Sequence, residues 1–144
     1  MKPAMHNILA FDYGVKRIGV AVGSLDTKIA TAISTIINKK DGPDWGAINN
    51  LIHEWQPEIL LVGVPVLHKN TGVHDTLLNE IDLFCTSLKE RFSLPVETCN
   101  EDFSSTEAYS LLKMQRAQGH KKKIERQEID KLAAAIILQC WLNQ

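Results

Sequence analysis

The sequence has no apolar run long enough to cross a membrane, since none approaches the roughly 18 to 20 residues that a transmembrane helix needs. Its first residues, MKPAMHN, show no signal-peptide pattern. Cysteine is scarce and odd in number, with Cys85, Cys99 and Cys140 widely spaced. This usage fits a reducing compartment better than a disulfide framework. We therefore expect a cytoplasmic protein.

The sequence also lacks an excess of positive charge, because 16 Lys and Arg face 17 Asp and Glu, for a net charge of −1. That balance argues against a protein that coats nucleic acid by bulk charge. The five histidines are scattered, and no Cys or His cluster has zinc spacing. Cations do gather between positions 116 and 126, where Glu125 alone opposes them. This segment is either a solvated helix end or a local binding site.

The length, 144 residues, suits one domain covering positions 1–144. Hydrophobic residues make up 44% and charged residues 23% of the chain, which excludes a disordered or collagen-like protein. A chain of this size can bury a core without disulfides or a structural metal.

The hydrophobic periodicity predicts strands and helices in a definite order. Strands are expected at 8–11, 18–23, 29–37, 59–64 and 95–99. Helices are expected at 45–55, through 77–92 after a loop from Pro65 to Thr71, from the Ser104 capping box, and at about 125–142. Short links make the first three strands antiparallel. The prediction is an α/β fold of ribonuclease H-like type, a mixed five-stranded sheet with three antiparallel strands followed by αβ units, flanked by helices.

Three carboxylates stand at places that this fold can bring together. Asp12 ends the first strand, and Glu101 follows the last one. Asp130 lies on the last helix, where it shares a face with Ala133, Ala134 and Ile137 and should point toward the sheet. The same helix carries residues expected to face inward, namely Ile129, Leu132, Ala133, Ile136 and Cys140. Taken singly, the three acids have structural explanations as a turn former, a helix cap and an ion-pair partner.

Taken together, the three carboxylates indicate a metal site. Their mutual repulsion would raise their pKa values unless cations compensate. Mg²⁺ prefers oxygen ligands and keeps waters that meet phosphate oxygens. Two such ions about 4 Å apart can activate water and stabilise the leaving oxygen of a phosphodiester. We therefore predict catalysis and metal binding by Asp12, Glu101 and Asp130.

The segment FDYGVKRIGVAVG at 11–23 strongly resembles the YqgF (RuvX) family of bacterial proteins, described as Holliday junction resolvases and pre-16S rRNA nucleases. GVPV at 63–66, with Thr71-Gly72 after it, is similar to a loop of that family. IDKLAA at 129–134 is similar to its closing helix. The resemblance spans nearly the whole chain.

The resemblance implies a two-metal site, with Mg²⁺ or Mn²⁺, on the same three acids. It further implies substrate contacts from the strand turn, the segment after Glu101 and the basic stretch before the last helix. These are Lys16, Arg17, Ser104, Ser105, Lys121, Lys122, Lys123 and Arg126.

One motif departs from the family pattern. Where the family has roughly Asp-Glu-Arg at the second acid, this chain has Asn100-Glu101-Asp102. The local charge changes from −1 to −2, which weakens phosphate binding at this point.

The leading hypothesis is a metal-dependent nuclease that cleaves structured RNA, in 5′ processing of pre-16S rRNA during ribosome biogenesis. The alternatives are a Holliday junction resolvase acting on DNA and a non-catalytic RNA-binding module of ribosome assembly. A phosphate loop of actin-like ATPases also resembles 12–22, but those enzymes need two such domains. Expected partners are nucleic acid and ribosomal precursor particles, with no membrane. The chain would be a monomer, or a homodimer formed through an exposed Tyr13 loop and the last helix.

Overall fold

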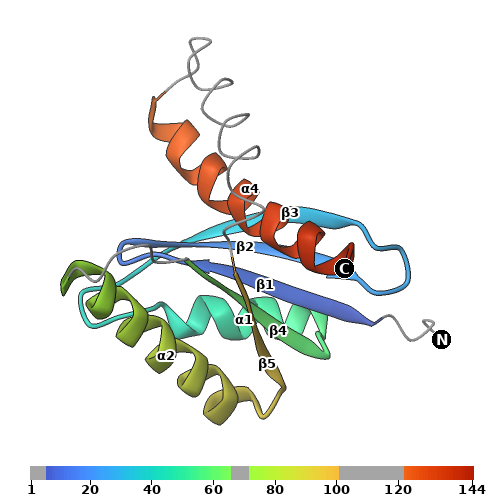
Figure 1. Cartoon of the computed structure of the whole chain (residues 1–144), viewed down its shortest axis with the longest axis horizontal. Helices are drawn as coiled ribbons and strands as arrows, with labels where there is room; N and C mark the ends of the chain where they lie inside the picture. Colours follow the sequence, from blue (N-terminus) through green and yellow to red (C-terminus); the bar gives the residue numbers. More distant parts are fainter. Residues whose placement is uncertain (1–5, 66–71, 101–121) are drawn as a thin grey trace.

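The computed structural model describes residues 6–65, 72–100 and 122–144. In these ranges the structure has five strands and three helices (Figure 1). The strands are β1 (Asn7–Tyr13), β2 (Arg17–Ser24), β3 (Ala30–Ile37), β4 (Ile59–Val64) and β5 (Val96–Asn100). The helices are α1 (Trp45–Trp55), α2 (Gly72–Phe92) and α4 (Lys122–Leu142).

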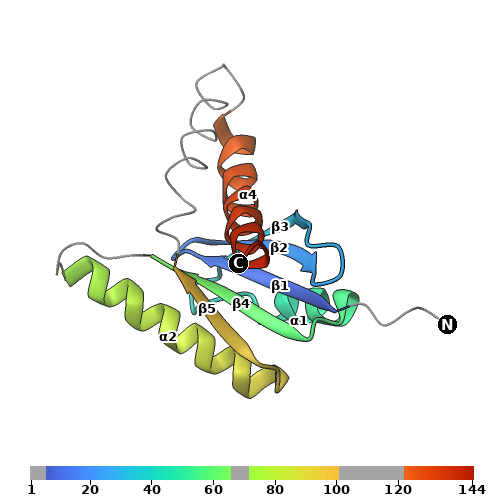
Figure 2. The ribbon, with the colours of Figure 1, turned by 45° about the vertical axis from the view of Figure 1, so that its right-hand side comes forward.

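The strands form one sheet in the order β3-β2-β1-β4-β5. β1 pairs antiparallel with β2, and β2 pairs antiparallel with β3. β4 pairs parallel with β1 on one side and with β5 on the other. Helix α4 covers one face of the sheet, while α1 and α2 cover the other (Figure 2). The predicted α/β fold, with its three antiparallel strands followed by αβ units, is confirmed.

Alternation along β1 divides the core between the two faces of the sheet. Leu9 and Phe11 belong to the cluster with α1 and α2, where Phe84 packs edge-on against Phe11. Ile8 and Ala10 belong to the cluster with α4. The side chain of residue 12 therefore lies on the α4 face, because successive strand residues point to opposite faces.

Helix α4 packs against β2 through a stripe of small residues. Gly19, Ala21 and Gly23 lie on that face of β2, and a Cβ added at Gly23 would lie 2.9 Å from Leu138 Cδ2. In the part of α4 whose side chains the structure describes, 129–142, the buried residues are Ala133, Ala134, Ile137, Leu138 and Leu142. Because these small residues of β2 allow a close approach, α4 packs against them with the face that carries Ala133 and Ala134.

The predicted inward face of the last helix was therefore partly wrong. Ala133 is buried as expected, but the other members are only half-buried: Ile129, Leu132, Ile136 and Cys140. The helix also begins at Lys122, three residues before the predicted start. Its apolar residues extend nearly all round, so the small residues of β2, and not the amount of apolar surface, decide which side is buried.

Tyr13 is not the exposed loop residue expected from the sequence. Its side chain is half-buried, with its ring centroid 5.1 Å from that of Phe84, and its hydroxyl donates to Glu80 Oε1 at 3.2 Å. Burial, followed by the charge of Glu80, raises the pKa of the Tyr13 hydroxyl. The predicted loop Pro65–Thr71 lies, apart from Pro65, outside the described residues, as does the Ser104 capping box. No helix of the described part is long and apolar enough to span a membrane.

Candidate metal and phosphate site

Asp12 stands near the end of β1 on the face covered by α4. It is half-buried and lies directly opposite Gly19 of β2 in the antiparallel register. Directly opposed residues of an antiparallel pair share one face of the sheet. The α4-facing side of Gly19, where a side chain would otherwise stand, is therefore next to Asp12.

The main chain of α4 fills that space at Asp130. A Cβ added at Gly19 would lie 1.8 Å from the backbone oxygen of Asp130 and 2.3 Å from its carbonyl carbon. Only glycine permits such a contact, so Gly19 marks a close approach of α4 to the sheet. The side chain of Asp130 is 24% exposed. The structure thus brings Asp12 and Asp130, 118 positions apart, to opposite sides of one glycine.

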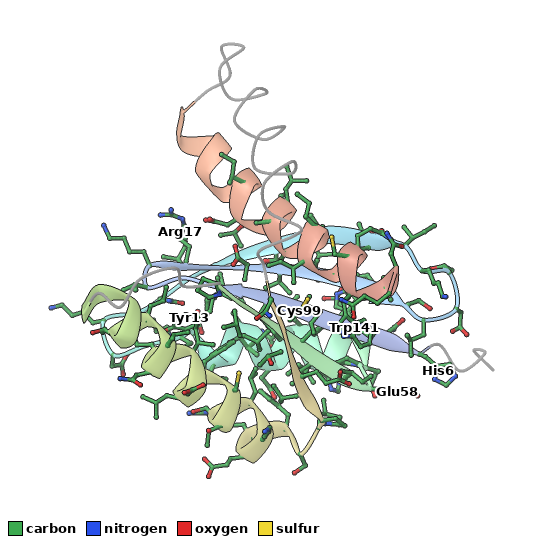
Figure 3. All side chains as sticks on the ribbon, viewed as in Figure 1. His6, Tyr13, Arg17, Glu58, Cys99 and Trp141 are labelled. Atoms are coloured by element: carbon green, nitrogen blue, oxygen red, sulfur yellow. The ribbon has the colours of Figure 1, made fainter. Side chains whose placement is uncertain are left out.

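Arg17, at the start of β2, contacts one of these two acids, Asp130. It lies two residues before Gly19, hence on the same face, and its Nε donates to Asp130 Oδ2 at 2.6 Å. Figure 3 labels Arg17 at this end of the sheet. The sequence predicted Arg17 as a phosphate contact; in the structure its partner is a predicted metal ligand. Charge-assisted bonds of this length are among the stronger polar contacts in proteins.

The turn between β1 and β2 presents Lys16 to solvent. Asn38 holds this turn, because its Nδ2 donates to the carbonyls of Gly14 and Val15, both at 2.9 Å. Its backbone N–H donates to the carbonyl of Lys16 at 2.9 Å. Sequence reasoning missed Asn38. The feature that could have identified Asn38 is the β2–β3 hairpin, because antiparallel pairing of Arg17 with Ile37 places residue 38 opposite residue 16.

The carboxyl end of β5 lies at the same edge of the sheet as Asp12. Phe11 pairs with Val62 of β4, and Val62 pairs in turn with Thr98 of β5. Cys99, the next residue, is buried on the α4 face. Glu101 follows two positions later and lies outside the described residues, together with Ser104, Ser105 and Lys121. The other predicted basic contacts, Lys122, Lys123 and Arg126, belong to the first turns of the α4 backbone.

The donor chemistry at Asp12 and Asp130 fits a hard divalent cation. Both side chains offer carboxylate oxygens, which Mg²⁺ and Mn²⁺ accept, and both remain partly open to solvent. Within ranges 6–65, 72–100 and 122–144, no group of three or more His, Cys, Asp or Glu side chains is arranged to hold a metal ion. The described part of the chain supplies two of the three predicted acids.

Comparisons with known proteins identify relatives over nearly the whole chain. A protein from Legionella pneumophila (strain Philadelphia 1), named "Putative pre-16S rRNA nuclease", is 40% identical over 136 residues, covering 94% of each chain. A protein of the same name from Xanthomonas oryzae pv. oryzae is 37% identical over 135 residues, covering 94% of this chain and 86% of its own.

Solved structures of RuvC from Thermus thermophilus share the fold. RuvC in complex with a Holliday junction substrate matches with a TM-score of 0.52 and 13% identity, covering 91% of this chain and 90% of its own. A second RuvC structure matches with a TM-score of 0.50 and 12% identity, covering 95% and 96%. The family model described as "RuvX: Holliday junction resolvase" matches residues 6–144. The chain belongs to the RuvX family.

Proposed function

We propose that this protein is a divalent-metal-dependent nuclease that hydrolyses phosphodiester bonds of structured RNA, acting in 5′ maturation of pre-16S rRNA. It works in the cytoplasm as a single domain over residues 1–144 and meets its RNA on ribosomal precursor particles. The observation that supports the proposal is that Asp12 and the backbone of Asp130 both lie against Gly19 on one face of the sheet. Two aspartates whose backbones are fixed beside one glycine are a suitable base for a cation site, because rigid elements position their side chains.

Asp12, Asp130 and Glu101 would hold the cations. When bound, Mg²⁺ or Mn²⁺ lowers the pKa of a water and stabilises the leaving oxygen of the phosphodiester. Gly19 has no side chain, so the two aspartates approach without a Cβ between them. Lys16 and the basic segment Lys121, Lys122, Lys123 and Arg126 would neutralise phosphates on either side of the scissile bond. Ser104 and Ser105 would donate hydroxyl hydrogen bonds to the substrate.

RNA is favoured over DNA because the relatives at 37–40% identity bear the name of an rRNA nuclease. The DNA alternative has its own support in the family description, Holliday junction resolvase. Resolution of a four-way junction needs two active sites presented together, and hence a homodimer. A non-catalytic RNA-binding module is the third alternative, supported by the Asn100 and Asp102 departure.

A cleavage assay on two substrates separates these functions. The probes are a labelled RNA with the 5′ leader of pre-16S rRNA and a labelled four-way DNA junction, each with Mg²⁺ or with EDTA. The proposal expects Mg²⁺-dependent cleavage of the RNA, lost in Asp12→Asn and retained in Asp82→Asn, an exposed acid on α2 across the sheet. Cleavage of the junction alone would assign the resolvase function. Binding of RNA without cleavage would assign the non-catalytic one.

A further inference from the structure

We infer that Arg17 exchanges its partner during the reaction, from Asp130 in the metal-free protein to a substrate phosphate once a divalent cation occupies Asp130. The inference rests on the proposed function and assigns Arg17 as the residue that couples metal binding to substrate binding. It starts from the 2.6 Å bond between Arg17 Nε and Asp130 Oδ2.

Arg17 and a divalent cation would compete for the Asp130 carboxylate. The backbone of Asp130 is fixed against Gly19, so its side chain would reach a bound cation from the same backbone position from which it reaches Arg17. A divalent ion on Asp130 would stand beside the guanidinium charge, and like charges at contact distance repel. Cation binding therefore favours a guanidinium that has moved away from Oδ2.

The ion pair is accessible enough to exchange. The two side chains are 30% and 24% exposed, so water can solvate both charges when the pair opens, which lowers the cost of breaking a bond that is strong at contact. Across the described residues, the structure shows one bond for this guanidinium, through Nε. Its two Nη groups remain to form the planar fork that suits phosphate oxygens.

Lys16 provides the matched comparison. It is the neighbouring residue, it is exposed, and its carbonyl is held by Asn38, while no ion pair is formed by its ammonium in the described part of the chain. Both side chains carry one positive charge near the same turn. Only Arg17 touches a predicted metal ligand, so only Arg17 should respond to the metal.

The exchange has a thermodynamic signature. Because coupling between two ligands is reciprocal, a residue released by the metal contributes to RNA binding only when the metal is present. Lys16 should contribute with and without metal. Arg17→Gln should also raise the affinity of the free protein for Mg²⁺, because the competitor is gone, and by more than Lys16→Gln does.

The test measures binding, not turnover. Wild type, Arg17→Gln, Arg17→Lys and Lys16→Gln are titrated with a fluorescent hairpin RNA that has a 5′ single-stranded extension, in EDTA and in Ca²⁺, which takes the same oxygen ligands. Mg²⁺ affinity of each free protein is measured by calorimetry. The ¹⁵N–¹H signal of Arg17 Nε is followed by NMR as Mg²⁺ is added.

We expect Arg17→Gln to weaken RNA binding about fivefold or more in Ca²⁺ and to leave it nearly unchanged in EDTA. Lys16→Gln should weaken binding in both buffers, and the Arg17 Nε signal should shift with Mg²⁺. Equal losses in both buffers, or an Nε signal that ignores Mg²⁺, would overturn the exchange. If the wild type binds Mg²⁺ and shows the exchange but cleaves no RNA, the proposed function fails while this inference stands. If the wild type cleaves RNA while the Arg17 Nε signal does not respond to Mg²⁺, the proposed function stands and this inference fails.

Discussion

Replacement of Gly19 by alanine tests the contact that builds the site. The new Cβ would lie 1.8 Å from the Asp130 carbonyl oxygen, whereas ordinary contacts begin at 3.4 Å. The obstacle is backbone on both sides, so no rotamer change relieves it. Helix α4 must therefore move away from β2 by about 1.6 Å at this point to restore an ordinary contact.

That displacement has two consequences of predictable size. Overpacking of a well-packed interface costs about 1–3 kcal/mol, and a backbone clash belongs at or above the upper end of that range. Because Asp130 moves with the helix while Asp12 stays on β1, the two carboxylates separate. A misplacement of about 1 Å at a reacting site can lower the rate about 100-fold.

Two glycines serve as controls for the Gly19→Ala variant. At Gly23 the nearest atoms are Leu138 Cδ2 at 2.9 Å and the Ile29 carbonyl oxygen at 3.0 Å, both much farther than the 1.8 Å contact at Gly19, so Gly23→Ala should be milder. At Gly46, in the first turn of α1, the nearest atom is Asp44 Oδ1 at 3.5 Å, so Gly46→Ala should be neutral or slightly stabilising. Urea denaturation followed by circular dichroism gives the unfolding free energies, and RNA cleavage gives the rates. Gly19→Ala with the stability and activity of Gly46→Ala would refute the close contact.

Three other features of the structure give further predictions. Gln139 accepts from the Ala30 N–H at 2.9 Å and donates to the Lys28 carbonyl at 2.8 Å, so Gln139→Ala should lower the unfolding free energy by about 1–3 kcal/mol in urea denaturation, with Gln144→Ala as a control at the chain end. Asn38→Ala removes two bonds to the Gly14–Val15 turn, and should raise the KM for RNA more than it lowers kcat because the turn presents Lys16. His6, paired with Glu58 at 2.8 Å (Figure 3), has its pKa raised above 6.5 by the hydrogen bond to Glu58, then by the charges of Glu58 and Asp26. The stability from this pair is fully present below pH 6.5 and is lost as the pH rises through the raised pKa, and Glu58→Gln should reduce that pH dependence of Tm.

Much of the fold follows from local sequence. The run Ile59–Val64 is continuously apolar, which predicted a buried strand, and the helical spacing of Trp45, Ile48, Ile52 and Trp55 predicted α1 with its observed bounds. The short links between the first three strands predicted antiparallel pairing. In each of the two αβ units a helix connects consecutive strands, which predicted parallel pairing for the last two strands. The placement of Asp130 toward the sheet followed from its alanine neighbours, because small residues mark a close approach.

The remaining features depend on contacts that no local pattern records. Alternation along β2 places Gly19, Ala21 and Gly23 on one face, but only the tertiary structure shows that α4 packs against that face. The bond between Arg17 and Asp130 joins residues 113 positions apart, and the bonds from Asn38 span 23 and 24 positions. The family motif suggests that Arg17 binds a substrate phosphate. It does not indicate which partner Arg17 has when no substrate is bound.

The central claim is that Asp12 and Asp130 belong to one catalytic metal site, and a double-mutant cycle on RNA cleavage tests it most directly. Rates are measured in saturating Mg²⁺ for the wild type, Asp12→Asn, Asp130→Asn and the double variant. Groups that act as one unit are strongly non-additive, so each single variant should lose about 1,000-fold or more and the double variant hardly more than either. Single variants that keep most of the wild-type rate, or losses that multiply in the double variant, would contradict a shared site.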